Sequence, residues 1–439
     1  MEFAIAERRS MSERYHQSEQ MLERALKTIP LGTQTFSKSK TQYPQGAAPF
    51  YVVRGQGSRV WDLDGNEYID FVNGLASITL GYNDPDVTAA VQEQLTQGVI
   101  FSLPHPIEVL VAEKMVEMIP CAQKVRFGKN GSDVTAAAIR LARAYTGRDH
   151  IAACGYHGWQ DWYIGATSRN LGVPEATRAL THMFRYNNIE SLHEIFKTYP
   201  GQVAAVILEP MNNTYPQHNF LEAVKDLAHH HGALLIFDEI ITGFRYANGG
   251  AQELFGVTPD LATFGKGMAN GYPVSAVVGR ADIMKLCEEA FFSFTFGGEA
   301  LSLAAAYAAM NKLQKYPVLS TIHERGSQLV TRVQEIILKH DVGHIFAISG
   351  HPSWTFLAIK EVIPYSAMQI KTLFLQEIFK RGVITIGTHN LSYAHSKQDI
   401  EQLANIYDEL FLMIKKAIDE ETLEKKLEVK PLELLFKLR

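Results

Sequence analysis

Two polar residues in the middle of the chain follow apolar segments and could carry out chemistry together. Asp238 ends the run ALLIFD, and Lys266 follows the run LATFG. Continuous apolar runs of this length are typical of strands that are buried on both faces of a parallel sheet. Because ligands of open α/β sheets bind at the carboxyl ends of the strands, we expect both side chains at one ligand-binding edge.

An aspartate and a lysine at such an edge suit an enzyme that uses pyridoxal 5'-phosphate (PLP). The carboxylate can hold the pyridine nitrogen of PLP protonated, and the lysine amine can form a Schiff base with its aldehyde. Each residue alone has a plainer interpretation, because aspartates often cap helices and lysines are usually solvated. The neighbours Gly265 and Gly267 favour catalysis at Lys266, since small residues leave room for a ligand beside the backbone.

The segment after the predicted strand KVRFG could bind a phosphate group. A phosphate needs backbone N–H groups at a helix N-terminus, with small or hydroxyl side chains beside them. Gly131 and Ser132 open the predicted helix VTAAAIRLARAY and meet this requirement. Ser132 or Asp133 could instead act only as a helix cap. The segment does not complete the pattern G-x-G-x-x-G, which disfavours a nicotinamide cofactor.

Three further features follow or precede predicted strands. Tyr156, after HIAAC, could stack on the pyridine ring, although a tyrosine of the core is the alternative. Glu209, at the end of VAAVILEP, could contact the cofactor or Lys266. The run His229–His231 ends a helix and lacks a carboxylate or cysteine at ligand spacing, so we predict no metal site there.

Composition and charge argue against several other classes of protein. The net charge of −5, from 42 basic and 47 acidic residues, does not indicate a nucleic-acid partner. Three widely spaced cysteines suggest neither disulfides nor zinc, and a charged N-terminus does not resemble a signal peptide. No apolar run approaches the length of a membrane span. We therefore expect a cytoplasmic protein without membrane or nucleic-acid partners.

The apolar pattern predicts an α/β protein with two domains. Between about residues 85 and 320, apolar strands alternate with amphipathic helices, which predicts a mostly parallel sheet covered by helices. The expected strands are KVRFG, HIAAC, VAAVILEP, ALLIFDE, LATFG and SAVVG. Beyond about residue 325, alternating helices and strands predict a separate α+β lobe.

The ends of the chain complete this division. A helix is predicted over residues from about 11 to 29, with Pro30 ending it, and two strands flank the turn dipeptide Asp64-Gly65. We expect residues 1–60 to contribute to the small domain and to a dimer contact, residues 61–324 to form the large cofactor-binding domain, and residues 325–439 to form the C-terminal small domain. The last residues, LEVKPLELLFKLR, are expected to pack against the same or a neighbouring subunit.

With these residues in place, the chain resembles the class III (subgroup II) PLP-dependent aminotransferases of fold type I, most closely their glutamate-1-semialdehyde 2,1-aminomutase branch. The resemblance extends over nearly the whole chain. Its motifs are IPLGTQTFSKS, VWDLDGNEYIDF, NGSDVTAAAIRLARAYTGRDHI, YHGWQD, AAVILEP, LLIFDEIITGFR, GGAQELFGVTPDLATFGKGMANGYPVSAVVGR, FTFGG and AHSKQDI. It implies a large domain with a seven-stranded, mostly parallel sheet and a smaller α+β domain.

The resemblance also implies roles for individual residues. Lys266 would be the Schiff-base lysine and Asp238 the partner of the pyridine nitrogen. Ile240 would pack against the cofactor ring, and Tyr156 would stack on it. Gly131 and Ser132 are the implied phosphate-binding residues.

Thr295, in FTFGG, matches the threonine that in this family reaches the phosphate of the neighbouring subunit's cofactor. The resemblance therefore implies a homodimer with shared active sites.

The chain departs from the family pattern where a substrate would bind. Lys38 stands in place of an N-terminal arginine, and a lysine cannot grip a carboxylate with a bidentate fork. Gly298-Glu299-Ala300 replaces the usual Gly-Asn-Pro, and a carboxylate there would favour an amine or a polyhydroxylated substrate. The segment GTHNLSYAHSK lacks an arginine that many relatives keep for a dicarboxylate.

We therefore predict an aminotransferase that moves an amino group from a small-molecule amino donor to a carbonyl acceptor. The donor is expected to be an amino acid, and the acceptor an aldehyde or ketone, with a sugar derivative as a hypothesis. Lys266, once released from PLP, would act as the general base. An intramolecular aminomutase is one alternative. A non-catalytic scaffold is another, and the presence of Asp238, Lys266 and Tyr156 argues against it.

Overall fold

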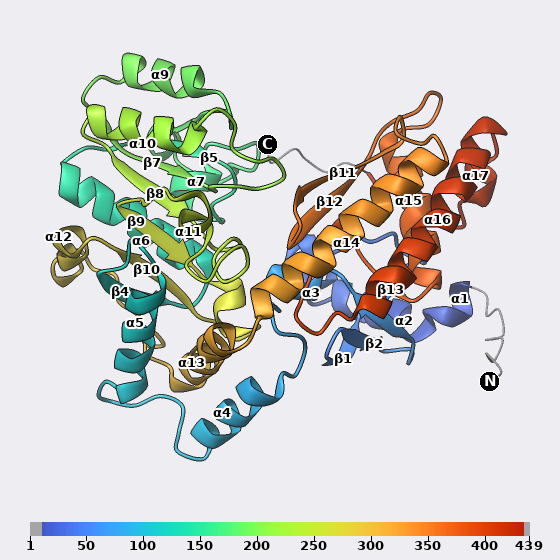
Figure 1. Cartoon of the computed structure of the whole chain (residues 1–439), viewed down its shortest axis with the longest axis horizontal. Helices are drawn as coiled ribbons and strands as arrows, with labels where there is room; N and C mark the ends of the chain where they lie inside the picture. Colours follow the sequence, from blue (N-terminus) through green and yellow to red (C-terminus); the bar gives the residue numbers. More distant parts are fainter. Residues whose placement is uncertain (1–10, 434–439) are drawn as a thin grey trace. The chain divides into compact units, whose positions relative to one another are not determined.

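The computed structural model describes residues 11–433, which divide into two compact units (Figure 1). Unit 1 contains the described residues up to 75 and those from 322 onward, and unit 2 contains residues 76–321. Residues 1–10 and the last six residues of the C-terminal tail lie outside the described residues. Within the described part, no helix combines the length and apolar character that a membrane crossing requires.

Unit 2 contains a seven-stranded sheet in the order β4-β10-β9-β8-β7-β5-β6. The strands are β4 (Lys124–Gly128), β5 (His150–Cys154), β6 (Thr181–Met183), β7 (Val203–Leu208), β8 (Leu234–Asp238), β9 (Leu261–Phe264) and β10 (Ser275–Gly279). Only β10 runs antiparallel to its two neighbours. The expected mostly parallel, seven-stranded sheet is confirmed.

The six strands expected from apolar runs all form, and β6 is the strand that the sequence pattern did not predict. It is only three residues long and carries the polar His182 at the edge of the sheet. A single short strand next to β5 lacks the continuous apolar run that marks a strand buried on both faces.

Helices cover the sheet of unit 2. They are α4 (Pro85–Leu95), α5 (Pro106–Met118), α6 (Gly131–Thr146), α7 (Asp161–Ile164), α8 (Glu175–Arg178), α9 (Ile189–Thr198), α10 (Phe220–His230), α11 (Ala251–Phe255), α12 (Ala281–Met284) and α13 (Ala300–Lys315), with the short 3-10 helices η3 (Lys266–Ala269) and η4 (Lys285–Glu288). Helix α6 packs across β7, β8, β9 and β10, while α10 packs against β7 and β8 (Figure 1).

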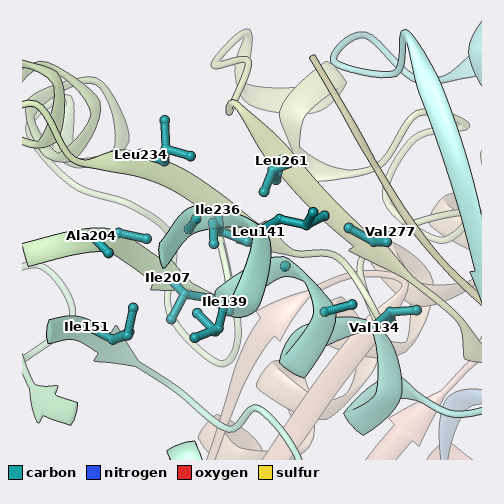
Figure 2. Packing of buried hydrophobic residues seen from close by; sticks show 14 of the residues in the cluster. Val134, Ile139, Leu141, Ile151, Ala204, Ile207, Leu234, Ile236, Leu261 and Val277 are labelled. Atoms are coloured by element: carbon teal, nitrogen blue, oxygen red, sulfur yellow. The ribbon is translucent and has the colours of Figure 1, made fainter. Parts of the chain in front are cut away.

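The core of unit 2 lies between α6 and the sheet (Figure 2). Ile139 and Leu141 of α6 meet Ile236 of β8 and Leu261 of β9 in one buried cluster. Burial of aliphatic side chains of this size contributes about 1.5–3 kcal/mol each. Because the cluster joins several strands to one helix, it fixes the strand ends that carry the polar residues.

Unit 1 contains two smaller sheets. One has the order β1-β2-β3-β13, with β1 (Val52–Gln56), β2 (Arg59–Asp62), β3 (Glu67–Asp70) and β13 (Val383–Ile384), and the other has the order β11-β12-β14, with β11 (Phe346–His351), β12 (Trp354–Ile359) and β14 (Thr388–Asn390). The helices are α1 (Met11–Arg14), α2 (His16–Leu26), α3 (Asn73–Ala76), α14 (Val318–Lys339), α15 (Ala367–Lys380), α16 (Lys397–Asp419) and α17 (Leu423–Lys426), with the 3-10 helices η1 (Pro30–Gly32) and η2 (Phe36–Lys38).

The expected domain boundary at residue 61 falls inside one of these sheets. Strand β2 pairs with β1 and β3, and β3 pairs in parallel with β13 from the C-terminal part of the chain. Residues 61–75 therefore belong to unit 1 rather than to the large domain. In the C-terminal tail, Leu432 is buried, and its N–H donates to Thr372 Oγ1 of α15 at 2.9 Å.

Candidate active site

Asp238 and Lys266 lie at the carboxyl ends of two adjacent parallel strands. Asp238 is the last residue of β8, and Lys266 follows Gly265 after the end of β9. Burial lowers the pKa of Lys266 to about 8, against the opposing effect of the Glu209 and Asp238 carboxylates. An amine with this pKa is partly neutral near physiological pH and can act as a nucleophile or a base.

The backbone at Lys266 has an unusual conformation. Its φ angle of 40° lies in the left-handed region, which costs a non-glycine residue about 1–3 kcal/mol. Asn270, at the end of the same turn, holds it in place. The Asn270 side chain accepts hydrogen bonds from the N–H groups of Thr79 and Leu80 at 3.0 and 2.9 Å, and it donates to the Gly81 carbonyl at 2.9 Å.

Asp238 is buried and bound from several sides. Its Oδ2 lies 2.7 Å from His157 Nδ1, and its Oδ1 accepts from the Ile240 N–H at 3.1 Å and from Thr263 Oγ1 at 3.3 Å. His157 Nε2 lies 3.1 Å from the Cys154 carbonyl, which can only accept and so requires a proton on Nε2. The contact between Nδ1 and Oδ2 therefore holds a second proton.

His157 is the residue of this site that sequence reasoning missed. In the sequence it stands only as the neighbour of Tyr156 in the motif YHGWQD. Its position after β5 places it near Asp238 only because β7 alone separates β5 from β8 in the sheet. A histidine after a predicted strand was a signal, but its partner lies 81 residues away in the sequence.

Glu209 and Tyr156 are joined to each other at this edge. Glu209 Oε2 accepts the Tyr156 N–H at 3.0 Å, and both Glu209 oxygens accept from Asn212 Nδ2 at 3.0 Å. A side chain at Gly155 would place its Cβ 2.4 Å from Glu209 Oε2, so only glycine fits there. Tyr156 is 43% exposed, whereas Tyr163 beside it is fully buried, so the core position belongs to Tyr163.

The predicted phosphate loop forms the N-terminus of α6. Asn130 is the cap, and its side chain accepts from the N–H groups of Ser132 and Asp133. The Ser132 hydroxyl accepts the Trp159 N–H at 3.2 Å and takes no part in this cap. A Cβ at Gly131 would lie 3.3 Å from Ile240 Cδ1. The start of α6 is thus in contact with the segment that follows Asp238.

Ile240 connects the predicted phosphate loop with the lysine segment. It is partly buried against the core, and a Cβ at Gly265 would lie 3.2 Å from the same Ile240 Cδ1 that approaches Gly131. Glycines on both sides let the backbone approach this side chain closely. The structure therefore brings Gly131, Ile240 and Gly265 together.

The three remaining predicted residues are exposed or are bound to other groups. Thr295 is exposed in the loop between η4 and α13, and Lys38 is exposed in η2 of unit 1. Glu299 caps α13 by accepting the N–H groups of Leu301 and Ser302. It also binds Lys129 Nζ at 2.8 Å.

Burial would raise the pKa of Glu299, but the bonds from Lys129 and Ser302 outweigh it and keep that pKa below its usual range. The carboxylate that was expected to face a substrate is thus used in a helix cap and an ion pair.

The histidine run ends α10, as expected. His229 Nε2 lies 2.8 Å from Asp260 Oδ2, and the ring of His231 stacks on Phe196 at 4.4 Å. Residues 11–433 contain no group of three or more histidine, cysteine, aspartate or glutamate side chains that could hold a metal ion.

Comparison with known proteins places the chain in a family. Residues 42–406 match the family model described as aminotransferase class-III. The 3-aminobutyryl-CoA aminotransferase of Cloacimonas acidaminovorans (strain Evry) is 33% identical, over 91% of this chain and 97% of that protein. The glutamate-1-semialdehyde 2,1-aminomutase of Aquifex aeolicus (strain VF5) is also 33% identical, over 88% of this chain and 97% of that protein.

A solved structure agrees with these sequence matches. The FumI protein of Sphingopyxis sp. MTA144, in its PLP internal aldimine form, superposes with a TM-score of 0.86 and is 28% identical, over 95% of this chain and 99% of that chain. The chain therefore belongs to the class III aminotransferases, and its α/β architecture is that of the fold type I enzymes.

Glu239, next to Asp238, provides a test of how this edge responds to pH. Its buried carboxylate accepts the Ala251 and Gln252 N–H groups at the start of α11, and burial raises its pKa from 4.5 to about 7. The folded protein therefore keeps a proton that the unfolded chain loses. The stability contributed by this group is complete below pH 4.5 and is lost as the pH rises through 7.

We expect Glu239→Gln to remove this pH dependence, because glutamine keeps the size of the side chain and cannot titrate. Between pH 5 and pH 8 the unfolding free energy of the wild type should fall relative to that of the variant, by about 3 kcal/mol at most. Chemical denaturation at several pH values measures this difference. Glu253→Gln, on the exposed side of α11, is the control. Parallel pH profiles for the wild type and Glu239→Gln would contradict the assignment.

Proposed function

We propose that this protein is a PLP-dependent aminotransferase that uses Lys266 and Asp238 at the carboxyl edge of β8 and β9. The observation that carries the proposal is the partly buried Lys266 amine, with its lowered pKa, and the nearby Asp238 carboxylate, which is held by His157. The substrates are a small-molecule amino donor and an aldehyde or keto acceptor. A PLP-containing relative with the same fold supports the choice of cofactor.

The residues at this edge fit the cofactor. The N-terminus of α6 offers the Gly131 N–H and the Ser132 hydroxyl to a phosphate, whereas the Ser132 N–H already donates to Asn130 Oδ1. Ile240 is partly buried and could pack against a flat ring, and Tyr156 is exposed enough to stack on it. Asp238 presents a fixed carboxylate that can hold a pyridine nitrogen protonated.

The chain's own residues then have distinct tasks. When bound, PLP acts as an electron sink for the carbon next to the substrate nitrogen. Lys266 Nζ would hold the cofactor. Once released, it would take a proton from that substrate carbon and return the proton to the cofactor. His157 would fix the orientation of Asp238, and Glu209 would hold the Tyr156 backbone.

Three free cysteines suit a reducing cytoplasm. A sugar derivative as the acceptor rests on Glu299 alone, whose carboxylate is bound by Lys129 and by the first turn of α13. We therefore propose an aldehyde or keto acceptor without naming a sugar.

An aminomutase is the second candidate, because the Aquifex aeolicus relative carries that name. The two reactions differ in their need for an external amino donor. A transferase exhausts its aminated cofactor after one acceptor turnover unless a donor such as glutamate or alanine is present. A mutase isomerises an amino-aldehyde substrate without a donor.

The role of Lys266 can be tested by loading the protein with PLP and reducing it with borohydride. We expect the peptide that contains Lys266 to carry the cofactor in mass spectra, and Lys266→Ala to carry none. Because the neutral amine reacts with the aldehyde, the rate of loading should rise about tenfold between pH 7 and pH 9, with a midpoint near the Lys266 pKa of about 8. Lys285→Ala, an exposed lysine of unit 2, is the control. Labelling of another lysine would contradict the assignment.

The role of His157 can be tested with His157→Phe, which removes the proton-sharing partner of Asp238. Hydrogen bonds to charged groups contribute about 1.5–3 kcal/mol, so PLP affinity should fall by about 10-fold to 100-fold. The pH midpoint of the cofactor's absorbance should also shift, which a loss of packing alone would not cause. His182→Phe, on the neighbouring β6, is the control. Unchanged affinity and an unchanged midpoint would contradict this role.

We also propose a homodimer with shared active sites, in which Thr295 reaches the partner's phosphate site. The exposed Thr295 lies between Phe294 and Phe296, and Phe291 in the same loop is 79% exposed. Large apolar side chains gathered on one loop are typical of an interaction surface. Leu103 is likewise 79% exposed.

Sedimentation equilibrium tests the dimer. We expect the wild type to sediment as a dimer and Phe296→Glu to dissociate at least tenfold more readily, because a charge would be buried in the interface. Leu171→Glu is the matched control, since Leu171 is 99% exposed elsewhere in unit 2. Thr295→Ala should remain dimeric and bind PLP more weakly. A monomeric wild type would contradict the proposal.

A further inference from the structure

Unit 2 contains a cavity of about 480 Å³ that the proposed reaction does not yet use. It lies where β5, β6 and β7 end, at the same edge of the sheet as Asp238 and Lys266. Pockets of about 300–1,000 Å³ commonly bind small molecules. Its walls are formed by Cys154, Gly155, Ala166, Thr167, Ser168, Met183, Phe184, Arg185, Tyr186, Glu209, Asn212 and Asn213.

The cavity adjoins the candidate active site through Glu209. This carboxylate lines the cavity, and its charge also acts on the pKa of Lys266. Gly155 lines the cavity as well, and the next residue, Tyr156, is tied to Glu209 by its backbone N–H. One carboxylate thus belongs both to the wall of the cavity and to the surroundings of the lysine.

Part of the cavity wall is apolar. Phe184 and Cys154 are buried in its wall, and Met183 and Ala166 complete this part of the lining. Contact with such side chains favours binding of a hydrocarbon chain, because the apolar surfaces of the chain and of the cavity wall are both removed from water. A short aliphatic segment of a ligand is therefore the group that this wall would accept.

Arg185 provides a positive charge at the cavity. It follows β6, its side chain is exposed, and its guanidinium forms no hydrogen bond or ion pair with the other residues from 11 to 433. Only its backbone N–H is engaged, with Ser191 Oγ at 2.9 Å. A guanidinium without a partner binds a carboxylate or phosphate readily, because its N–H groups match two anionic oxygens.

The cavity therefore carries opposite charges on two of its strand ends, with Glu209 after β7 and Arg185 after β6. A ligand with a positive amine, an apolar chain and a terminal anion would match this arrangement of charges. Specificity of this kind comes from complementary charges at fixed positions.

We propose that this cavity is a substrate subsite, in which Arg185 binds an anionic group that an apolar chain separates from the reacting amine. The inference rests on the proposed aminotransferase function, because that function requires the reacting amine of the substrate to lie near Lys266. In this subsite the Arg185 guanidinium, which belongs to unit 2, would bind the acid group of the substrate. It would make an acid-terminated amine a better donor than a neutral amine of equal length.

The experiment follows the visible absorbance of the PLP-loaded protein while single amines are added. The amines are 6-aminohexanoate, its neutral counterpart hexylamine, and ethylamine, which is too short to fill the cavity. We expect half-saturation at an amine concentration at least tenfold lower for 6-aminohexanoate than for hexylamine. Arg185→Gln should raise this concentration about tenfold for 6-aminohexanoate only, and Arg185→Lys should restore part of the loss.

Two further variants test the cavity and the charge separately. Ala166→Leu should raise the half-saturating concentration of both six-carbon amines and leave that of ethylamine unchanged, because leucine occupies the apolar part. Lys197→Gln removes a positive charge from α9, which does not line the cavity, and should change nothing. Unfolding curves show whether each variant is folded.

The outcomes separate the subsite from the function on which it rests. If amines change the absorbance but 6-aminohexanoate and hexylamine behave alike in the wild type and in Arg185→Gln, the subsite is wrong and the aminotransferase proposal stands. If Arg185→Gln weakens all three amines equally, Arg185 does not recognise an anion. If no amine changes the absorbance of the PLP-loaded protein, the proposed function fails, and the subsite fails with it.

Discussion

A buried carboxylate is stable only when hydrogen bonds or positive charge replace the water that it has lost, and Asp238 imposes this constraint on its surroundings. Its two oxygens are bound by His157, by Thr263 and by the backbone of Ile240. These partners come from three different segments of unit 2. The position of Asp238 therefore depends on the order of the strands and on the core that holds them together.

A second constraint is that the backbone near the site must pass close to neighbouring side chains. Gly155 has a positive φ angle and no room for a side chain beside Glu209, so Tyr156 can bind that carboxylate through its N–H. Lys266 itself adopts a left-handed conformation, and Asn270 holds the turn that contains it. Strain of this kind persists where neighbouring hydrogen bonds fix the chain, and it is often found where a protein binds a ligand.

The departures from the family pattern acquire a physical meaning in the structure. Glu299 is occupied as the cap of α13 and as the partner of Lys129, which leaves its carboxylate little freedom to bind a substrate. Arg185, in contrast, has an unpartnered guanidinium among the described residues and lines a cavity next to Glu209. Arg185 is therefore better placed than Glu299 to select a substrate by its charge.

The sequence by itself determined the strands β5, β7, β8, β9 and β10, because each contains a buried apolar run, as expected for strands covered on both faces. It also indicated β4, although Lys124 and Arg126 of that strand are exposed. It also indicated that Asp238 and Lys266 follow strands, and its motifs indicated the family. The tertiary structure decided which distant groups meet. Only the sheet order brings His157 to Asp238, only pairing with β13 assigns residues 61–75 to unit 1, and only the helix start shows that Asn130 rather than Ser132 is the cap. Apolar periodicity is a local property, whereas hydrogen-bond partners depend on how segments far apart in the sequence pack.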